Sequence, residues 1–253
     1  ALFEIPSYIA KMVENNWLGS KSGQGFYKKT KDENGKKQIL SLDLSSLEYT
    51  PQVKAKFPTL EMAKPVDDLK ERTKILLSGK DKAGEFYRKL FGGLFAYVSN
   101  RIPEISDELY KIDDALKAGF GWNLGPFETW DIVGKEKGLK WIEEAGKSAA
   151  SWVSEMSSDT FYSVKDGAKY YYDQGSKTNK IIPGSSEKVD LDTLREGNTI
   201  WKNADSTIVH LGDGILNVEF HTKMNTIGGG VIQGINKAVE LAEKEYKGIV
   251  VSN

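Results

Sequence analysis

Apolar residues recur every three or four positions in several stretches of the chain, and this spacing predicts amphipathic helices. The predicted helices cover residues 3–17, 66–78, 83–100, 109–118, 126–133, 135–145 and 227–242. The 66–78 stretch is rich in Lys and Glu, whereas the 83–100 stretch is rich in aromatic residues. Most of the middle of the chain is therefore expected to be helical.

Other stretches have the composition and turn residues of short strands. Asn34-Gly35 predicts a hairpin turn before a strand at 38–42, and Asp213-Gly214 predicts one between strands at 207–211 and 215–220. Aromatic and polar residues alternate around Asp166-Gly167 and Gln174-Gly175, which indicates a β meander. A linker with one helical turn is expected over 185–198, and a last strand over 249–252. The predicted fold class is α+β.

The segment from Ile112 to Gly134 predicts a tight corner between two helices. Gly119 and Gly121 follow an amphipathic run, at the place where a chain leaving a helix needs residues that tolerate positive φ. Pro126 suits the first turn of the next helix, which needs no N–H at that position. Such a corner is a rigid part of a helical core and performs no chemistry by itself.

Composition limits the possible classes of function. The chain has 253 residues, 39% of them hydrophobic, which is enough to bury a core. Its net charge of −1 gives no field directed at nucleic acid or membrane. It contains no cysteine, so disulfides and thiolate metal sites are excluded. No apolar run is long enough to cross a membrane, and the cytoplasm is the expected location.

The residues of the corner, Ile112-Asp-Asp-Ala-Leu-Lys-Ala-Gly-Phe-Gly-Trp-Asn-Leu-Gly-Pro-Phe-Glu-Thr-Trp-Asp131, resemble the C-terminal helical domain of 3-hydroxyacyl-CoA dehydrogenases. Their form is most similar to proteins that fuse this dehydrogenase to an enoyl-CoA hydratase (crotonase) module. The Gly23-Gln-Gly-Phe-Tyr27 run resembles the end of the same helical domain. The resemblance implies the tail of a first helical copy over 1–45 and a second copy over 60–150.

The last fifty residues resemble the opening of the crotonase fold. Their predicted order is hairpin, helix and strand, with a Lys223-Met-Asn225 run before the helix and Ile249-Val-Val-Ser252 as the last strand. The resemblance implies a β meander and linker over 155–200 and a truncated crotonase-like start over 204–253. The chain lacks an initiator methionine and stops after an apolar run, so we expect it to be a piece of a longer protein.

The resemblance implies that the parent protein oxidises a 3-hydroxyacyl-CoA with NAD and hydrates enoyl-CoA. This segment is expected to bind no cofactor and to act as scaffold, because no Gly-rich turn follows a strand in the manner of a dinucleotide site. No catalytic residue is predicted. Asn100-Arg101 matches the residue types of the family's substrate-contacting pair. In the family that pair lies a full helix earlier relative to the Ile112 segment, so Asn100 is interpreted as a helix end. The only histidines, His210 and His221, lie in predicted strands or at their ends.

One binding residue follows from the crotonase resemblance. Lys223 stands in a region that approaches the ribose-phosphate of CoA in relatives, although a solvated lysine at a strand end is the alternative. His221 as a metal ligand has no second ligand nearby, and no metal site is predicted.

A competing interpretation is a non-catalytic helical interaction or dimerisation module. In that case Trp122, Trp130 and Trp141 would be exposed and would serve assembly only. The Tyr170-Tyr171-Tyr172 run allows either a stacking platform for bases or a sheet face packed on the helices. The partners expected for the parent are an acyl-CoA substrate and either a second copy or the missing domains, with no nucleic acid and no membrane.

Overall fold

The structure is a computed structural model that describes residues 4–165, 167–187 and 189–252, apart from the side chains of residues 192, 193 and 196. Helices and three small sheets give an α+β arrangement, as predicted. The chain forms two compact units, Ala1–Phe57 and Pro58–Asn253. Each unit is described on its own below.

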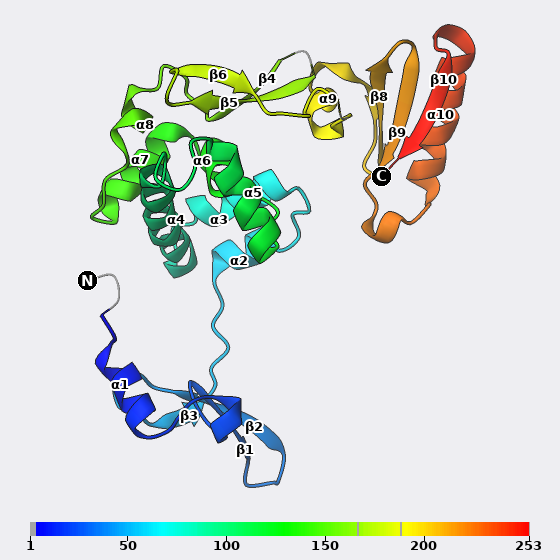
Figure 1. The fold of residues 1–253 in the computed structure, drawn as a ribbon. Helices are drawn as coiled ribbons and strands as arrows, with labels where there is room; N and C mark the ends of the chain where they lie inside the picture. Colours follow the sequence, from blue (N-terminus) through cyan, green and yellow to red (C-terminus); the bar gives the residue numbers. More distant parts are fainter. Residues whose placement is uncertain (1–3, 166, 188, 253) are drawn as a thin grey trace. The chain divides into compact units, whose positions relative to one another are not determined.

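The first unit contains a short helix and a three-stranded antiparallel sheet (Figure 1). Its elements are α1 (Ser7–Glu14), the 3-10 turn η1 (Ser20–Ser22), β1 (Tyr27–Lys31), β2 (Lys37–Leu42) and β3 (Tyr49–Pro51). Gly35 adopts φ +77° in the predicted hairpin turn. The helix expected over 3–17 is shorter because Pro6 is extended at its start and Asn16 turns to φ +58° after its end. Residues 1–3 of that expectation lie outside the described residues.

Seven helices open the second unit. They are α2 (Pro58–Ala63), α3 (Leu69–Ser78), α4 (Lys82–Asn100), α5 (Leu109–Phe120), α6 (Pro126–Val133), α7 (Lys135–Glu144) and α8 (Ser151–Glu155). The helices at 83–100, 109–118, 126–133 and 135–145 are confirmed, and the one predicted from 66 begins at Leu69. Asp68 caps that helix by accepting a hydrogen bond from the Glu71 amide at 2.8 Å.

Aromatic rings fill the core of this helical part. Phe95 stacks on Trp130 at 4.7 Å between ring centroids, and Phe161 packs against Trp130 at 4.9 Å. All three side chains are fully buried. Trp141 is buried too, so the expectation that Trp130 and Trp141 are exposed is wrong. Their helical spacing placed them on the apolar face, and that face is the core.

The β meander packs on the helices. It consists of β4 (Tyr162–Lys165), β5 (Ala168–Asp173) and β6 (Thr178–Ile181), in antiparallel order β4-β5-β6. Tyr171 contacts Tyr110 of α5 at 4.9 Å between ring centroids, and Tyr172 stacks on Trp152 of α8 at 6.3 Å. The tyrosine run is therefore a packing face. Gly167 turns at φ +76°, while Asp166 of the predicted turn lies outside the described residues.

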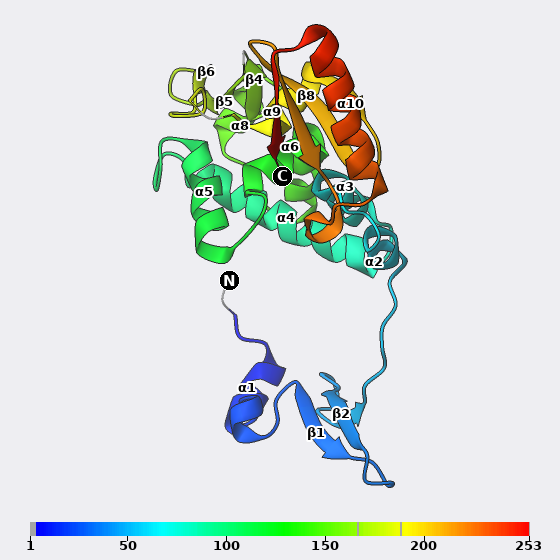
Figure 2. The ribbon, with the colours of Figure 1, turned by 90° about the vertical axis from the view of Figure 1, so that its right-hand side faces the viewer.

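The remaining residues form a four-stranded sheet with its own buried cluster. Its elements are α9 (Leu191–Asn198), β7 (Thr199–Lys202), β8 (Ser206–Gly212), β9 (Ile215–Phe220), η2 (Lys223–Asn225), α10 (Gly229–Glu245) and β10 (Gly248–Ser252). The strand order is β10-β9-β8-β7, and only β9 and β10 are parallel. Figures 1 and 2 show α10 lying along one face of this sheet.

The hairpin, helix and strand order expected for this region is confirmed. Asp213 and Gly214 have φ +52° and +81°, as the hairpin turn requires. The expected linker over 185–198 is wrong in part, because residues 191–198 form the two-turn helix α9. Strand β7 was not predicted.

Candidate functional site

The corner between α5 and α6 is built around glycines with different tasks. Gly121 ends α5 in the left-handed conformation at φ +66°, as predicted. Gly119 lies inside α5 without positive φ, so that part of the expectation is wrong. Gly125 is the N-cap of α6, and Pro126 is its first residue. A Cβ added to Gly125 would lie 2.2 Å from Cγ of Asp113.

That close approach exists because Asp113 of α5 caps α6. Its carboxylate accepts hydrogen bonds from the backbone amides of Phe127 at 3.0 Å and Glu128 at 2.9 Å, and from the hydroxyl of Tyr162 at 3.0 Å. Asp113 is fully buried. Burial is the largest influence on its pKa and raises it to about 7, although the two amide hydrogen bonds lower it.

A second set of polar contacts, made by less buried side chains, joins α5 to the start of α6. Glu128 accepts from the Gly125 amide at 2.7 Å, which is the side-chain half of a capping box. Lys117 of α5 donates to Glu128 at 3.0 Å and pairs with Asp114 at 3.1 Å. The first turn of α6 therefore has its amides satisfied by carboxylates from two elements.

Asp131 of α6 holds the start of the meander. Its carboxylate accepts hydrogen bonds from the backbone amides of Phe161 at 2.8 Å and Tyr162 at 2.9 Å. Burial raises the pKa of Asp131 to about 7, while these two amides lower it. Asp113 and Asp131 thus fix both ends of Tyr162, at the hydroxyl and at the main chain.

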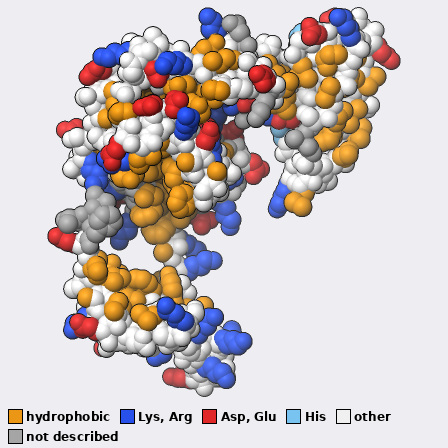
Figure 3. Space-filling model, in the orientation of Figure 1, with side chains coloured by type: hydrophobic (Ala, Val, Ile, Leu, Met, Phe, Trp, Pro, Cys, Tyr) orange, Lys and Arg blue, Asp and Glu red, His pale blue; other side chains and the backbone are white. Residues whose placement is uncertain are grey.

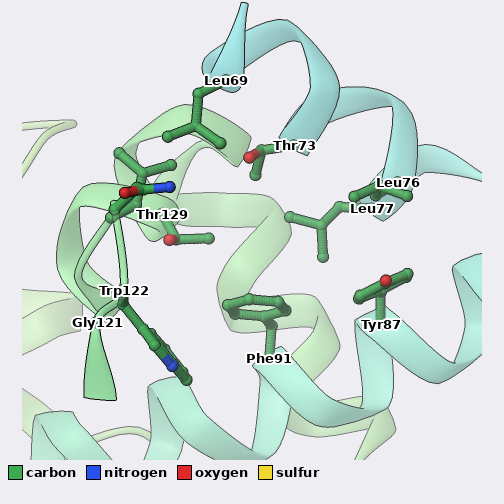
Figure 4. Close-up of a pocket in the computed structure, with 11 residues that line it drawn as sticks. Leu69, Thr73, Leu76, Leu77, Tyr87, Phe91, Gly121, Trp122 and Thr129 are labelled. Atoms are coloured by element: carbon green, nitrogen blue, oxygen red, sulfur yellow. The ribbon is translucent and has the colours of Figure 1, made fainter. Parts of the chain in front are cut away.

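An apolar cleft of about 290 Å³ opens beside the corner (Figure 4). Residues of α3, α4, the α5–α6 loop and α6 line it: Leu69, Thr73, Leu76, Leu77, Tyr87, Phe91, Gly121, Trp122, Asn123, Leu124 and Thr129. No Asp, Glu, Lys or Arg belongs to this lining. The Oγ1 of Thr129 donates to the Gly125 carbonyl at 2.8 Å.

The loop residues at the cleft were part of the sequence resemblance, but the cleft was not foreseen. The sequence analysis also did not identify Asp113 and Asp131 as residues that hold the fold together, although their spacing indicates it. Asp113 follows Leu109 by four positions and Asp131 follows Phe127 by four, so each carboxylate lies on the buried face of its helix. A charged residue on an apolar stripe needs partners when buried.

Asn100 is the last residue of α4, as interpreted. Its side-chain amide donates to the carbonyls of Ala96 at 2.8 Å and Ser148 at 3.0 Å. These bonds join the end of α4 to the segment after α7. The residue has a structural task and is not part of the cleft.

Lys223 lies far along the chain, in the turn after β9. Its side chain is exposed and forms no ion pair among the described residues. The neighbouring Met224 and Asn225 have φ +59° and +53°, an uncommon conformation for residues other than glycine. The backbone of this loop is thus partly left-handed, and the Lys223 side chain lies at the protein surface.

The two histidines lie in or directly after strands β8 and β9, His221 beside a hydroxyl group and His210 beside an aromatic ring. Nε2 of His221 is 2.6 Å from the hydroxyl of Thr207, and the His210 ring packs edge-on against Tyr246 at 5.4 Å. Neither ring has a carboxylate hydrogen-bond partner among the described residues. Within the same part of the chain no cluster of three or more metal-ligating side chains occurs. No helix of the described chain is long and apolar enough to cross a membrane.

Three curated proteins are similar to nearly the whole chain. A probable 3-hydroxyacyl-CoA dehydrogenase of Bacillus subtilis (strain 168) is 38% identical over 256 aligned residues, which cover 100% of the chain and 32% of the relative. A putative fatty acid oxidation complex trifunctional enzyme of Rickettsia prowazekii (strain Madrid E) is 26% identical over 95% of the chain and 29% of the relative. Its counterpart in Rickettsia felis (strain ATCC VR-1525 / URRWXCal2) is 24% identical over 96% of the chain and 29% of the relative.

The chain therefore spans about a third of the length of the curated relatives it matches. Their names agree with the resemblance to a 3-hydroxyacyl-CoA dehydrogenase segment seen in the sequence. No family model and no solved structure matches the chain.

Proposed function

We propose that this chain is a segment of an enzyme of fatty-acid β-oxidation that oxidises 3-hydroxyacyl-CoA with NAD in the cytoplasm. One observation carries the proposal. A relative named as a probable 3-hydroxyacyl-CoA dehydrogenase matches the chain from end to end at 38% identity. The fatty acid oxidation enzymes of two other organisms match it over 95% and 96% of its length.

Within that enzyme, residues 60–150 serve as a second helical copy and residues 1–45 as the tail of a first. An apolar stripe on α4 supports a packing role. Phe86, Leu90 and Tyr97 are spaced by four and seven residues, and each side chain is at least half exposed. Figure 3 shows hydrophobic side chains gathered over α4. Burying such a stripe against another helical domain would stabilise the parent protein.

The chemistry of hydride transfer belongs to other parts of the parent. A dehydrogenase needs a histidine oriented by a carboxylate as its general base. His210 and His221 contact Tyr246 and Thr207 instead. A dinucleotide site needs a Gly-rich turn between a strand and a helix, and the sequence offers none that fits NAD. The segment therefore supports the fold of the enzyme and binds no cofactor.

Residues 204–253 would begin an enoyl-CoA hydratase module of the same parent. In that module the exposed Lys223 would contact the ribose-phosphate of CoA, because a lysine held at the surface of a strained loop can meet a phosphate without losing other contacts. The hydrated product of such a module is the substrate of the dehydrogenase.

An assay of the purified chain beside the full-length parent tests the proposal. We expect the parent to reduce NAD when it is given 3-hydroxybutyryl-CoA, and the 253-residue chain to show no turnover. Turnover by the chain alone would contradict the assignment of the base to another domain. A parent that lacks both activity and an upstream Gly-x-Gly-x-x-Gly turn would refute the dehydrogenase function itself.

The second candidate is a non-catalytic interaction or dimerisation module. It rests on the same α4 stripe and on Trp122, since Trp130 and Trp141 are buried and unavailable. A homodimer of the chain that is lost with Leu90→Lys, in a parent without an upstream dinucleotide fold, would favour this candidate. The matched control is Lys140→Glu on α7, whose side chain is 73% exposed.

A further inference from the structure

The sheet of the first unit has an open edge along part of β1. In the strand order β1-β2-β3 the outer side of β1 has no neighbouring strand, apart from a single bridge at Lys28. In an antiparallel ladder, only alternate residues bond to the partner strand. The Asp32 amide bonds to the Lys36 carbonyl at 2.8 Å, at the end of the β1–β2 ladder. Lys31 and Lys29 alternate with this position, so their backbone groups point away from β2.

Three of these backbone groups are available to a partner. The amide of Lys31 and the carbonyl of Lys29 have no hydrogen-bond partner among the described residues. The carbonyl of Lys31 receives only the Thr30 hydroxyl at 3.5 Å and can accept a second bond. An added antiparallel strand would therefore gain three hydrogen bonds on this edge.

The side chains on one face of the edge are basic and unpaired. Because side chains alternate along a strand, the exposed Tyr27, Lys29 and Lys31 lie on the same face. Their cross-strand neighbours Ile39 and Lys37 share that face. It carries no Asp or Glu, and its lysines form no ion pair among the described residues. Figure 3 shows basic side chains gathered over the β1–β2 hairpin.

This face also contains a repulsion that nothing on it relieves. Lys31 lies directly opposite Lys37, and like charges at such positions destabilise a sheet. The carboxylate of the adjacent Asp32 is held instead by the amides of Asn34 and Lys36, each at 2.9 Å. From the open edge and this uncompensated charge, we propose that β1 binds an extended acidic segment of another protein as an added strand.

The register of the edge specifies the sequence of that segment. The residues opposite Lys29 and Lys31 lie two apart on the basic face, so both should be Asp or Glu. The residue between them lies opposite Thr30, on the half-buried face, where Thr or Val suits a strand. Lysines at an edge deter neutral and basic strands, and the same lysines make this edge selective for an acidic one. A lipid surface or a nucleic acid would meet the charge but leave the backbone groups unused.

An end-blocked heptapeptide of alternating Thr and Glu tests the proposal on the 253-residue chain. It should shift the ¹⁵N NMR signal of the Lys31 amide and slow the hydrogen exchange of that amide, which becomes a donor to the peptide. A peptide of alternating Thr and Lys should do neither. N-methylation of the Glu residues keeps the charge but removes the donors to the two lysine carbonyls. Binding of that peptide should be about thirtyfold weaker, because two hydrogen bonds are lost.

A pair of charge reversals tests the role of the lysines. Lys29→Glu combined with Lys31→Glu should weaken binding of the acidic peptide by about tenfold or more, because two attractive cross-strand pairs become repulsive. The matched control is Lys54→Glu combined with Lys56→Glu. It makes the same change at the same spacing on exposed residues outside the strands, and it should bind the peptide within about twofold of the unchanged chain. The reversal on β1 places a carboxylate opposite Lys37 and should not impair folding.

The indole signal of Trp17, which packs against Tyr49 at 5.6 Å between ring centroids, shows whether the first unit of each variant is folded. No response of the Lys31 amide up to about 10 mM acidic peptide would overturn the proposal. Equal binding of the N-methylated peptide would also overturn it, because charge attraction alone would then explain the contact. Phosphatidylserine vesicles or single-stranded DNA that bind through the two lysines, without peptide binding, would assign the face to another anion and refute the added strand. None of these outcomes depends on the dehydrogenase activity of the parent.

Discussion

At the scale of single residues, Gly125 and Asp113 depend on each other. A Cβ on Gly125 would lie 2.2–2.6 Å from three atoms of Asp113, including its Cα, so the contact cannot be relieved by a side-chain rotation alone. Gly125→Ala should therefore destabilise the chain by about 2–3 kcal/mol in urea unfolding. Gly119→Ala is the matched control. It lies in α5 with open space around it and should raise the free energy of unfolding by up to about 1 kcal/mol.

The buried carboxylates make stability depend on pH. The folded-state pKa of Asp113 is about 7, above the unfolded value of 3.8, so the folded protein binds more protons between these two values. The free energy of unfolding should then fall as the pH rises from about 4 to about 7, and this contribution stays lost above that range. Asp131 acts in the same direction. For Asp113 the effect amounts to at most about 4 kcal/mol.

Urea unfolding of the wild type and Asp113→Asn across this pH range measures the effect. As the pH rises toward 8, the free energy of unfolding of the wild type should fall relative to that of Asp113→Asn. The asparagine side chain has no proton to release, so its contribution does not change with pH. A constant difference between the two proteins at every pH would show that Asp113 acts through its hydrogen bonds alone.

At the scale of elements, Tyr162 links the meander to the helices. Tyr162→Phe removes the hydroxyl donor to Asp113 and should lower the free energy of unfolding by about 1–2 kcal/mol. The control is Tyr170→Phe in β5, whose hydroxyl has no hydrogen bond among the described residues and whose loss should cost less than about 0.5 kcal/mol. Equal losses in both variants would argue against the Tyr162–Asp113 contact.

The long helices and the glycine turns could be predicted from the sequence, but the short elements could not. α4 and α10 each present several turns of periodic pattern, and Asp213-Gly214 specifies its turn directly. β3 and β7 have three and four residues, too few to show alternation, and they pair only because a neighbouring strand offers a free edge.

The candidate site shows the same division. Gly121 and Trp122 belong to the sequence motif that resembles the dehydrogenase family. The cleft that they line is also formed by residues of α3, which begins some fifty residues earlier. The partners of Asp131 lie 30 and 31 residues away. Contacts over such separations depend on how helices pack, and no local pattern specifies that.

At the scale of the whole molecule, the sheet at the end of the described chain has an exposed apolar edge strand. β10 pairs with β9 on one side, and Val250 and Val251 are about half exposed. Open edges recruit other strands. In hydrogen exchange, β10 should be weakly protected in a monomer or gain protection as the chain associates at higher concentration. Strong and uniform amide protection over residues 204–252 in a monodisperse monomer would contradict this expectation.

The hydrogen bonds at the start of α6 also prevent that helix from binding phosphate at its N-terminus. Free amides at a helix start attract phosphate. Here Asp113 and Glu128 already occupy the amides of Phe127, Glu128 and Gly125 with carboxylate oxygens. Side-chain oxygens of the protein thus occupy these donors, so a diphosphate would find none of the three amides vacant. A phosphate-bearing ligand that reaches this corner must therefore have its phosphates held by another surface.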